Sequence, residues 1–113
     1  MTDAEFIALA LRLPETALSS HFGKADLRVR GKIFGGPAEG RDGDALLKLT
    51  PAQQEMMCEA EPRLFRPVPG GWGAKGWTLL ALAAADEATA RGALWTAWRN
   101  VAPAALVKQH PTA

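Results

Sequence analysis

The chain has 113 residues, of which 48% are hydrophobic and 22% are charged. These values are ordinary for a globular protein, and the length suits a single domain over residues 1–113 whose core needs no disulfide. The 13 basic and 12 acidic residues leave a net charge of +1. This balance excludes a globally basic protein, so any surface for nucleic acid must come from local charge.

Targeting and redox signals are absent from the sequence. Cys58 is the single cysteine, which excludes an internal disulfide and a cysteine cluster for zinc. The acidic start, Met1–Phe6, lacks the pattern of a signal peptide. The longest apolar run, Leu79–Ala85, is too short to span a bilayer. We therefore expect a cytoplasmic protein with no membrane partner.

The first predicted helix begins at a capping box formed by Thr2 and Glu5 and ends at Pro14. A strand is predicted next, over Lys24–Arg30, because the period changes to two. Charged residues alternate there with small and apolar ones, which is typical of a strand with one solvated face.

The return strand and a long loop follow. Gly31-Lys32 is predicted as a two-residue turn with glycine first, and Ile33-Phe34 begins the return strand. The segment Gly35–Asp44 is rich in Gly, Pro, Asp and Glu, which predicts a loop. Ala45–Leu49 is predicted as a further strand.

The second helix opens at Thr50–Gln53, with Thr at the N-cap, Pro at the first position and Gln at the third, and is limited by Pro62. Two strands are predicted after it, Leu64–Val68 and Trp77–Leu82. They are joined by a loop within Gly70–Thr78, where four glycines frame two tryptophans and one lysine. Glycine accepts positive φ, so this loop can turn tightly and hold its indoles in a fixed relation.

The third helix is predicted from near Asp86 to about Ala102, and Pro103 stops it or starts a last short turn. The period changes from about 3.6 to 2 and back, which predicts one α+β domain. It has an antiparallel sheet with about three helices packed on one side. The expected core consists of Phe6, Leu27, Val29, Leu47, Leu49, Leu79, Leu94, Trp98 and Val101.

Ordered motifs over nearly the whole chain resemble the MmcQ/YjbR-like family. The motifs are LRVRGKIF (Leu27–Phe34), LLKLTPAQQ (Leu46–Gln54), RLFRPVPG (Arg63–Gly70), WGAKGWT (Trp72–Thr78) and WRNVAP (Trp98–Pro103). The resemblance implies a small, cytosolic, bacterial protein with a double-wing α+β fold akin to a phage DNA-binding domain. It also implies DNA binding, by analogy of fold. One departure is Gly35-Gly36-Pro37, where the family pattern continues with apolar residues.

The first candidate surface is the charged face of the first hairpin. Arg28 and Arg30, flanked by Lys24 and Lys32, put four cations and Asp26 along one side of the strand and its turn. Strand neighbours two apart lie roughly 6.5–7 Å from each other, which is near the spacing of phosphates along a DNA strand. We expect Arg28 and Arg30 to be exposed. The same pattern also suits a solvated strand face that discourages edge aggregation.

The second candidate surface is the loop with Trp72, Lys75 and Trp77. Lys75 could approach a phosphate while an indole offers a stacking face. Alternatively, Trp77 is mostly buried, Trp72 covers the edge of the core and Lys75 is an exposed hairpin tip. Arg63 and Arg66 lie nearby, with no acid between Pro62 and Leu82, so these cations are predicted to be uncompensated.

Catalytic and cofactor signals are weak. Ser19, Ser20 and His21 form no triad pattern, and His110 lies close to the last residue. Cys58 follows two methionines on a predicted helix, which favours a small buried hydrophobe. Asp42 and Asp44 lack the calcium-loop spacing. No catalytic residue, metal or cofactor is predicted, and we do not expect an enzyme.

Two functions remain open. The first is a non-catalytic module that binds DNA or another anionic ligand through basic hairpins and the Gly-Trp loop. The alternative is a domain that binds a small ligand or a protein and no nucleic acid. The sequence leaves DNA versus RNA and the oligomeric state open and favours a monomer. The candidate anion-binding residues are Arg28, Arg30, Lys32, Arg63, Arg66, Trp72 and Lys75.

Overall fold

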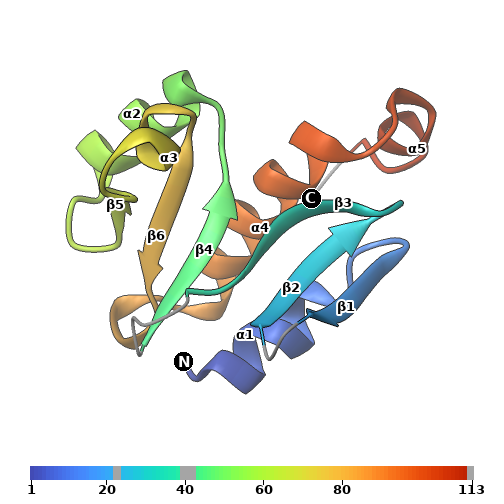
Figure 1. Ribbon diagram of the computed structural model, residues 1–113, viewed down its shortest axis with the longest axis horizontal. Coiled ribbons are helices and arrows are strands. Elements are labelled where there is room, and N and C mark those ends of the chain that lie inside the picture. Colours follow the sequence, from blue (N-terminus) through green and yellow to red (C-terminus); the bar gives the residue numbers. More distant parts are fainter. Residues whose placement is uncertain (22–23, 39–42, 112–113) are drawn as a thin grey trace.

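The computed structural model describes residues 1–21, 24–38 and 43–111. Its elements are α1 (Asp3–Ala10), β1 (Thr16–His21), β2 (Lys24–Val29), β3 (Lys32–Pro37), β4 (Asp44–Lys48), α2 (Pro51–Ala60), β5 (Phe65–Pro67), α3 (Gly71–Ala74), β6 (Trp77–Ala81), a 3₁₀ turn (Leu82–Ala84), α4 (Glu87–Val101) and α5 (Ala104–Gln109). Within the described residues, six strands form one antiparallel sheet in the order β1-β2-β3-β4-β6-β5 (Figure 1).

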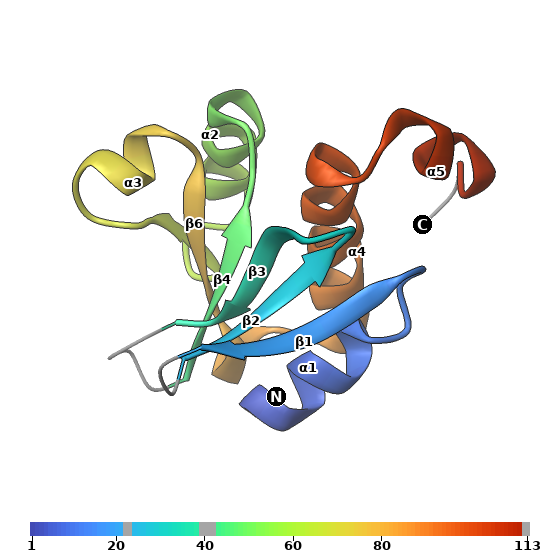
Figure 2. The same cartoon turned by 45° about the vertical axis from the view of Figure 1, so that its right-hand side comes forward.

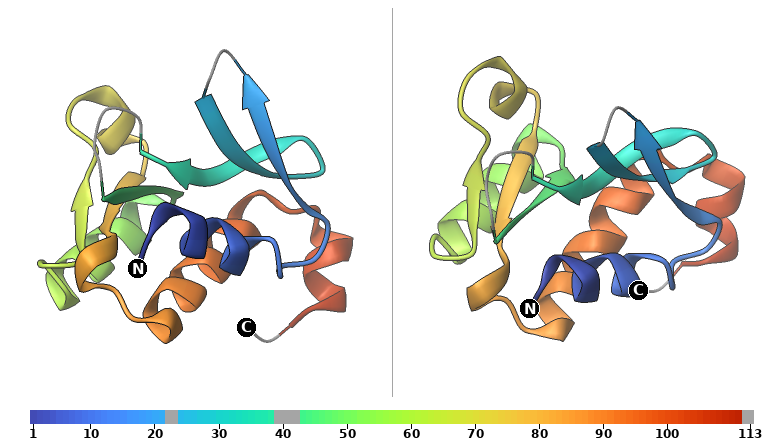
Figure 3. Two further views of the ribbon diagram at one scale, coloured as in Figure 1. Left: turned by 90° about the horizontal axis from the view of Figure 1, so that it is seen from below. Right: turned by 60° about the horizontal axis from the view of Figure 1, so that its bottom comes forward.

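Helices α1 and α4 pack against one face of the sheet, which we call the inner face (Figure 3). Burial of large apolar side chains there, worth roughly 1.5–3 kcal/mol each, is the main stabilising contribution. Helix α2 adds Met57 and Cys58 at the border of this core. The predicted fold class is therefore confirmed. The predicted core residues that are buried in the inner cluster are Phe6, Leu27, Val29, Leu47, Leu49, Leu94 and Trp98.

Two residues of the predicted core differ. Val101, at the end of α4, is half-buried and packs against the cluster. Leu79 is buried, with 2% exposure, but it lies outside the inner cluster because it alternates with Leu80, which points to the inner face. Leu79 therefore belongs to the opposite, outer face of the sheet.

The three predicted helix starts are confirmed by their caps. Thr2 and Glu5 form a capping box at α1, and Thr50 and Gln53 form another at α2. The Asp86 carboxylate accepts the first-turn N–H of α4 at 2.7 Å, and this hydrogen bond lowers its pKa. Each cap satisfies backbone N–H groups that have no partner inside the helix.

Three or four strands were expected before α2, but no bounds were predicted for β1. It pairs with β2 along its whole length, from Thr16 opposite Val29 to His21 opposite Lys24. Its sequence lacks a clear apolar alternation, and its one large apolar side chain, Leu18, is 45% exposed. Pairing with β2, and not burial of its own side chains, therefore forms this strand.

The turn between β2 and β3 lies at Arg30-Gly31, one residue earlier than predicted. Both residues have positive φ, 51° and 80°, as the type I′ turn of a two-residue hairpin requires. The register shifts at Leu27/Arg28, and such a bulge increases strand twist. In Figure 2 the β1–β2 pair accordingly runs across the direction of β4 and β6.

The predicted loop over residues 35–44 is wrong at its first positions. Strand β3 continues to Pro37, because Gly35 and Gly36 pair with Leu47 and Leu46 of β4. Positions 39–42 of that loop lie outside the described residues.

The segment between β5 and β6 contains the one-turn helix α3 where a simple hairpin loop was predicted. The two strands pair in an antiparallel manner. The side-chain amide of Gln54, on α2, donates to the carbonyl oxygens of Gly73 and Trp77 at 3.0 Å and to Thr78 Oγ1 at 3.1 Å. These hydrogen bonds hold the segment against α2.

The two edges of the sheet are unequal. Strand β5 has three residues and ends at Pro67, whereas β1 has six residues without proline, lysine or an acid. Among the described residues, no helix has the length and hydropathy needed to cross a membrane.

Candidate functional site

The outer face of the sheet presents one row of residues from four neighbouring strands. Gly36, Leu46, Leu79 and Arg66 are consecutive register partners across β3, β4, β6 and β5. Helix α3 and the β1–β2 pair stand on either side of this face (Figure 3, left). The outer face is therefore flanked by two projections.

A hollow of about 370 Å³ lies on this outer face. Its volume is in the lower part of the range of ligand pockets, about 300–1,000 Å³. Most of its described lining is apolar, and the charged residues among the described lining residues are Lys24 and Asp26. The lining residues that matter below are Ile33, Gly35, Gly36, Ala38, Trp72 and Trp77.

Two tryptophans and two lysines form an aromatic and cationic group beside the hollow. The indole of Trp72, on α3, is 64% exposed, and the Lys75 ammonium lies 5.5 Å from its ring centroid. Trp72 and Trp77 meet edge to face with centroids 6.3 Å apart, and Lys48 Nζ lies 4.9 Å from the Trp77 ring. Trp77 was predicted to be mostly buried; it is half-buried on the outer face.

Arg66 is not an uncompensated cation as predicted, because it forms an ion pair with Asp44 of β4. The sequence argument counted only the acids between Pro62 and Leu82, so it missed Asp44. The sheet brings Asp44 close to Arg66 because β4 and β5 both flank β6. Arg28 is also paired and only half exposed. Its Nε and Nη2 donate to the two carboxylate oxygens of Asp26 at 2.7 and 3.2 Å, which raises the pKa of Arg28.

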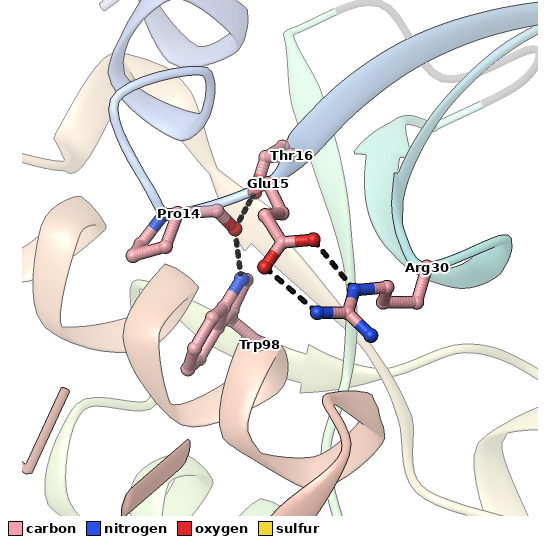
Figure 4. A network of polar contacts seen from close by, with 5 residues as sticks. All are labelled: Pro14, Glu15, Thr16, Arg30 and Trp98. Atoms are coloured by element: carbon pink, nitrogen blue, oxygen red, sulfur yellow. Dashed lines mark hydrogen bonds and ion pairs between the residues drawn. The ribbon is translucent and has the colours of Figure 1, made fainter. Parts of the chain in front are cut away.

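Arg30 belongs to a different contact network (Figure 4). Its Nε and Nη2 donate to the Glu15 carboxylate at 2.5 and 3.0 Å, and these hydrogen bonds lower the pKa of Glu15. The neighbouring Pro14 carbonyl accepts the indole N–H of Trp98 at 3.0 Å and the hydroxyl of Thr16 at 3.5 Å. Arg30 is exposed as predicted, but it ties the β2–β3 turn to the segment before β1.

The structure brings only part of the predicted set together. Trp72 and Lys75 adjoin the hollow, while Arg28 and Arg66 lie on the outer face through their strand positions. Lys32 begins β3, and Arg63 lies between α2 and β5; both are exposed. The site residues missed by sequence reasoning include Leu46 and Lys48, which alternate with the buried Ala45, Leu47 and Leu49. That alternation was the available signal.

Cys58 and His110, two of the residues considered for catalysis, lie against side chains of the core. Burial raises the pKa of the Cys58 thiol, and the side chain packs against the core. His110 is half-buried, with its ring edge-on to Trp98 at 6.1 Å between centroids. In the part of the chain that the structure describes, no three His, Cys, Asp or Glu side chains are grouped to hold a metal ion.

The fold and the outer face define a small α+β domain whose antiparallel sheet is covered by helices on one side and hollowed on the other. The YjbR family model matches residues 11–100, so this chain belongs to the YjbR family. This confirms the resemblance seen in the motifs.

The crystal structure of Deinococcus radiodurans protein DR2400, described by the domain DUF419, is similar in fold. Its TM-score is 0.65 and its sequence identity is 16%, over 96% of this chain and 86% of that chain. No curated protein matches the sequence.

Proposed function

We propose that this domain is a nucleic-acid-binding module that holds DNA on the outer face of its sheet, without catalysis. The observation that supports this best is the pair formed by Trp72 and Lys75. The indole is 64% exposed, and the ammonium lies 5.5 Å from the ring centroid. Stacking of a base on such an indole is worth ~1–3 kcal/mol, and the neighbouring cation attracts phosphate.

The charge of the outer face supports the same proposal. Its described cations are Lys24, Arg28, Lys48, Arg66 and Lys75, and its described carboxylates are Asp26 and Asp44. Cations therefore predominate, although the whole chain is nearly neutral. Arg28 and Arg66 are ion-paired, but a guanidinium has five N–H donors, so each pair fixes the position of the guanidinium and leaves donors for a phosphate.

The geometry favours a single strand over a duplex. A base reaches the face of an exposed indole only when it is unstacked from its neighbours, as in single-stranded nucleic acid. Stacking has little preference among bases, so we expect weak sequence specificity. The β1–β2 pair and the β5–α3–β6 segment would act as the two wings that the family resemblance implies. The partner would be DNA in a bacterial cytoplasm, bound by a monomer.

A titration of fluorescently labelled DNA tests this proposal. We expect a single strand to bind more tightly than a duplex of the same sequence, with affinity falling as salt rises. Trp72→Ala should weaken binding about tenfold, the equivalent of ~1.4 kcal/mol of lost stacking. Lys75→Ala should flatten the salt slope by ~0.7, as expected for one lost phosphate contact on a single strand.

Arg91→Ala is the matched control for Lys75→Ala, because Arg91 is an exposed cation on α4. It should leave both affinity and salt slope unchanged. Absence of DNA binding at low salt would refute the proposal. An equal loss in Arg91→Ala and Lys75→Ala would also refute it, because binding would then depend on charge without a defined face.

A further inference from the structure

The hollow lies beside two consecutive glycines of β3. Gly36 of β3 takes the outer-face position beside Leu46, and Gly35 and Gly36 both line the hollow. Gly36 puts no side chain on the outer face, and a Cβ there would lie 3.0 Å from the carbonyl oxygen of Ala25, so backbone forms this part of the lining. Ile33 and Trp72, which are 36% and 64% exposed, extend the lining with apolar surface. The open surface therefore suits a flat apolar group.

A polar group in the lining lacks its partner. Trp77 lines the hollow, and within the described residues its indole N–H is buried without a hydrogen-bond acceptor. Buried donors are nearly always paired in folded proteins, so an acceptor from a bound molecule would remove this deficit. This favours a ring that contains nitrogen or a carbonyl oxygen over a plain hydrocarbon ring.

The charged groups around the hollow indicate which substituent the bound ring carries. Lys24 lines the hollow, and Lys75 lies over the adjoining Trp72 ring. Among the described lining residues the one carboxylate is Asp26, which accepts hydrogen bonds from Nε and Nη2 of Arg28. The surroundings of the ring therefore favour an anionic substituent.

We propose that the hollow over Gly35 and Gly36 is a site for one nucleobase with an attached phosphate. The base stacks on Trp72, the half-buried Trp77 indole shifts to donate its N–H to a base acceptor, and the phosphate lies near Lys24 and Lys75. The inference rests on the proposed function in using Trp72 as the stacking face. The same chemistry is available from a base in a DNA strand and from a free mononucleotide.

An NMR titration of the ¹⁵N-labelled protein tests the site directly. Adenosine monophosphate should shift the indole N–H signals of Trp72 and Trp77, while ribose 5-phosphate, which has no base, should not. Trp72→Phe and Trp77→Phe assign the two signals. The proposal is overturned if adenosine monophosphate at high concentration moves neither signal, or if ribose 5-phosphate moves both equally.

Filling the hollow provides a second test. Ala38 lines it, so Ala38→Leu should weaken the binding of adenosine monophosphate about tenfold or more. Ala52→Leu makes the same change at an exposed position of α2 and should leave binding unchanged. Circular dichroism should show both variants folded. Equal affinities of the two variants would contradict the site.

The DNA titration then separates this inference from the proposed function. If single-stranded DNA binds through Trp72 and Lys75 while Ala38→Leu has no effect, the hollow is not the base site and the proposed function stands. If adenosine monophosphate binds in the hollow and neither form of DNA binds, the domain is a mononucleotide site and the proposed function is wrong. Loss of both ligands in Ala38→Leu supports a base of the strand in the hollow.

Discussion

Alanine substitutions at the four glycines between β5 and β6 can separate two physical reasons for a glycine: a positive φ and the close approach of a neighbouring backbone atom. Gly71 has ordinary φ and open space around its Cα, whereas Gly70 has φ +84° and open space. Gly73 has ordinary φ, but a Cβ there would lie 1.8 Å from the carbonyl oxygen of Val68. Gly76 combines both conditions. Substitution by alanine at each position therefore tests backbone strain, steric overlap, both or neither.

Gly70 and Gly71, which have open space around them, show the effect of backbone conformation without steric overlap. Gly71→Ala should be neutral or stabilise the protein by up to ~1 kcal/mol, because alanine restricts the unfolded chain. Gly70 has φ 84° and ψ −155°, a region that only glycine occupies readily. Alanine there should cost about 2 kcal/mol. For a domain of this size that corresponds to a fall of about 8 °C in Tm.

The two crowded positions should cost more. Real Cβ atoms essentially never approach within 3.0 Å, so Gly73→Ala must move the backbone near Val68. We expect a loss of about 3 kcal/mol. At Gly76 a Cβ would lie 1.9 Å from the carbonyl oxygen of Leu49, and φ is +106°. If strain and overlap add, Gly76→Ala loses about 5 kcal/mol, which approaches the whole stability of a marginal domain.

Urea unfolding followed by circular dichroism measures the free energy of unfolding of the four variants. Their midpoints can be compared directly when the dependence on urea, the slope m, is the same. The expected order of stability is Gly71→Ala, Gly70→Ala, Gly73→Ala and then Gly76→Ala. Equal midpoints for Gly73→Ala and Gly71→Ala would refute the close approach of the Val68 carbonyl. Equal midpoints for Gly70→Ala and Gly71→Ala would refute the positive φ at Gly70.

Two further predictions concern side-chain hydrogen bonds. Gln54→Leu should lower the free energy of unfolding by about 2 kcal/mol, because the hydrogen bonds from its amide to Gly73, Trp77 and Thr78 are lost. Glu55→Leu, on the exposed side of α2, should change it by less than about 0.5 kcal/mol in the same urea assay. Glu15, whose pKa is lowered by Arg30, should titrate below its ordinary value of 4.5 in an NMR pH titration. Because the folded pKa is the lower one, the stability that this contact adds is complete above pH 4.5 and is lost as pH falls through the folded pKa. The difference in the free energy of unfolding between the native protein and Glu15→Gln should therefore shrink over that pH range. A titration midpoint of Glu15 at or above 4.5 would contradict the contact.

The parts of the fold that follow from local chemistry could be predicted from the sequence. The caps at Thr2, Thr50 and Asp86 act within three residues of each helix start, so the chain displays them directly. Strand β1 could not be found in this way because its partner β2, and not its own side-chain pattern, forms it. The same holds for Gly35-Gly36-Pro37, a glycine-rich segment that pairing with β4 makes a strand.

The candidate site also combines features that follow from local sequence with features that depend on the order of strands in the sheet. Trp72 and Lys75 were predicted to lie together, and they do because a short glycine-rich segment joins them. The partners of Arg30 and Arg66 lie 15 and 22 residues away in sequence, and the order of strands in the sheet brings them into contact. Counting charges along the chain therefore overestimated the free cations of the second hairpin.

The unequal edges of the sheet differ in how readily a strand of another molecule could pair with them. At β5 the short strand and its proline leave little backbone for another strand to pair with, whereas β1 presents six residues without a charge that would repel one. Antiparallel pairing of β1 with the β1 of a second copy would use the open edge of both molecules. Such association would stop at two subunits and would not continue into a fibre.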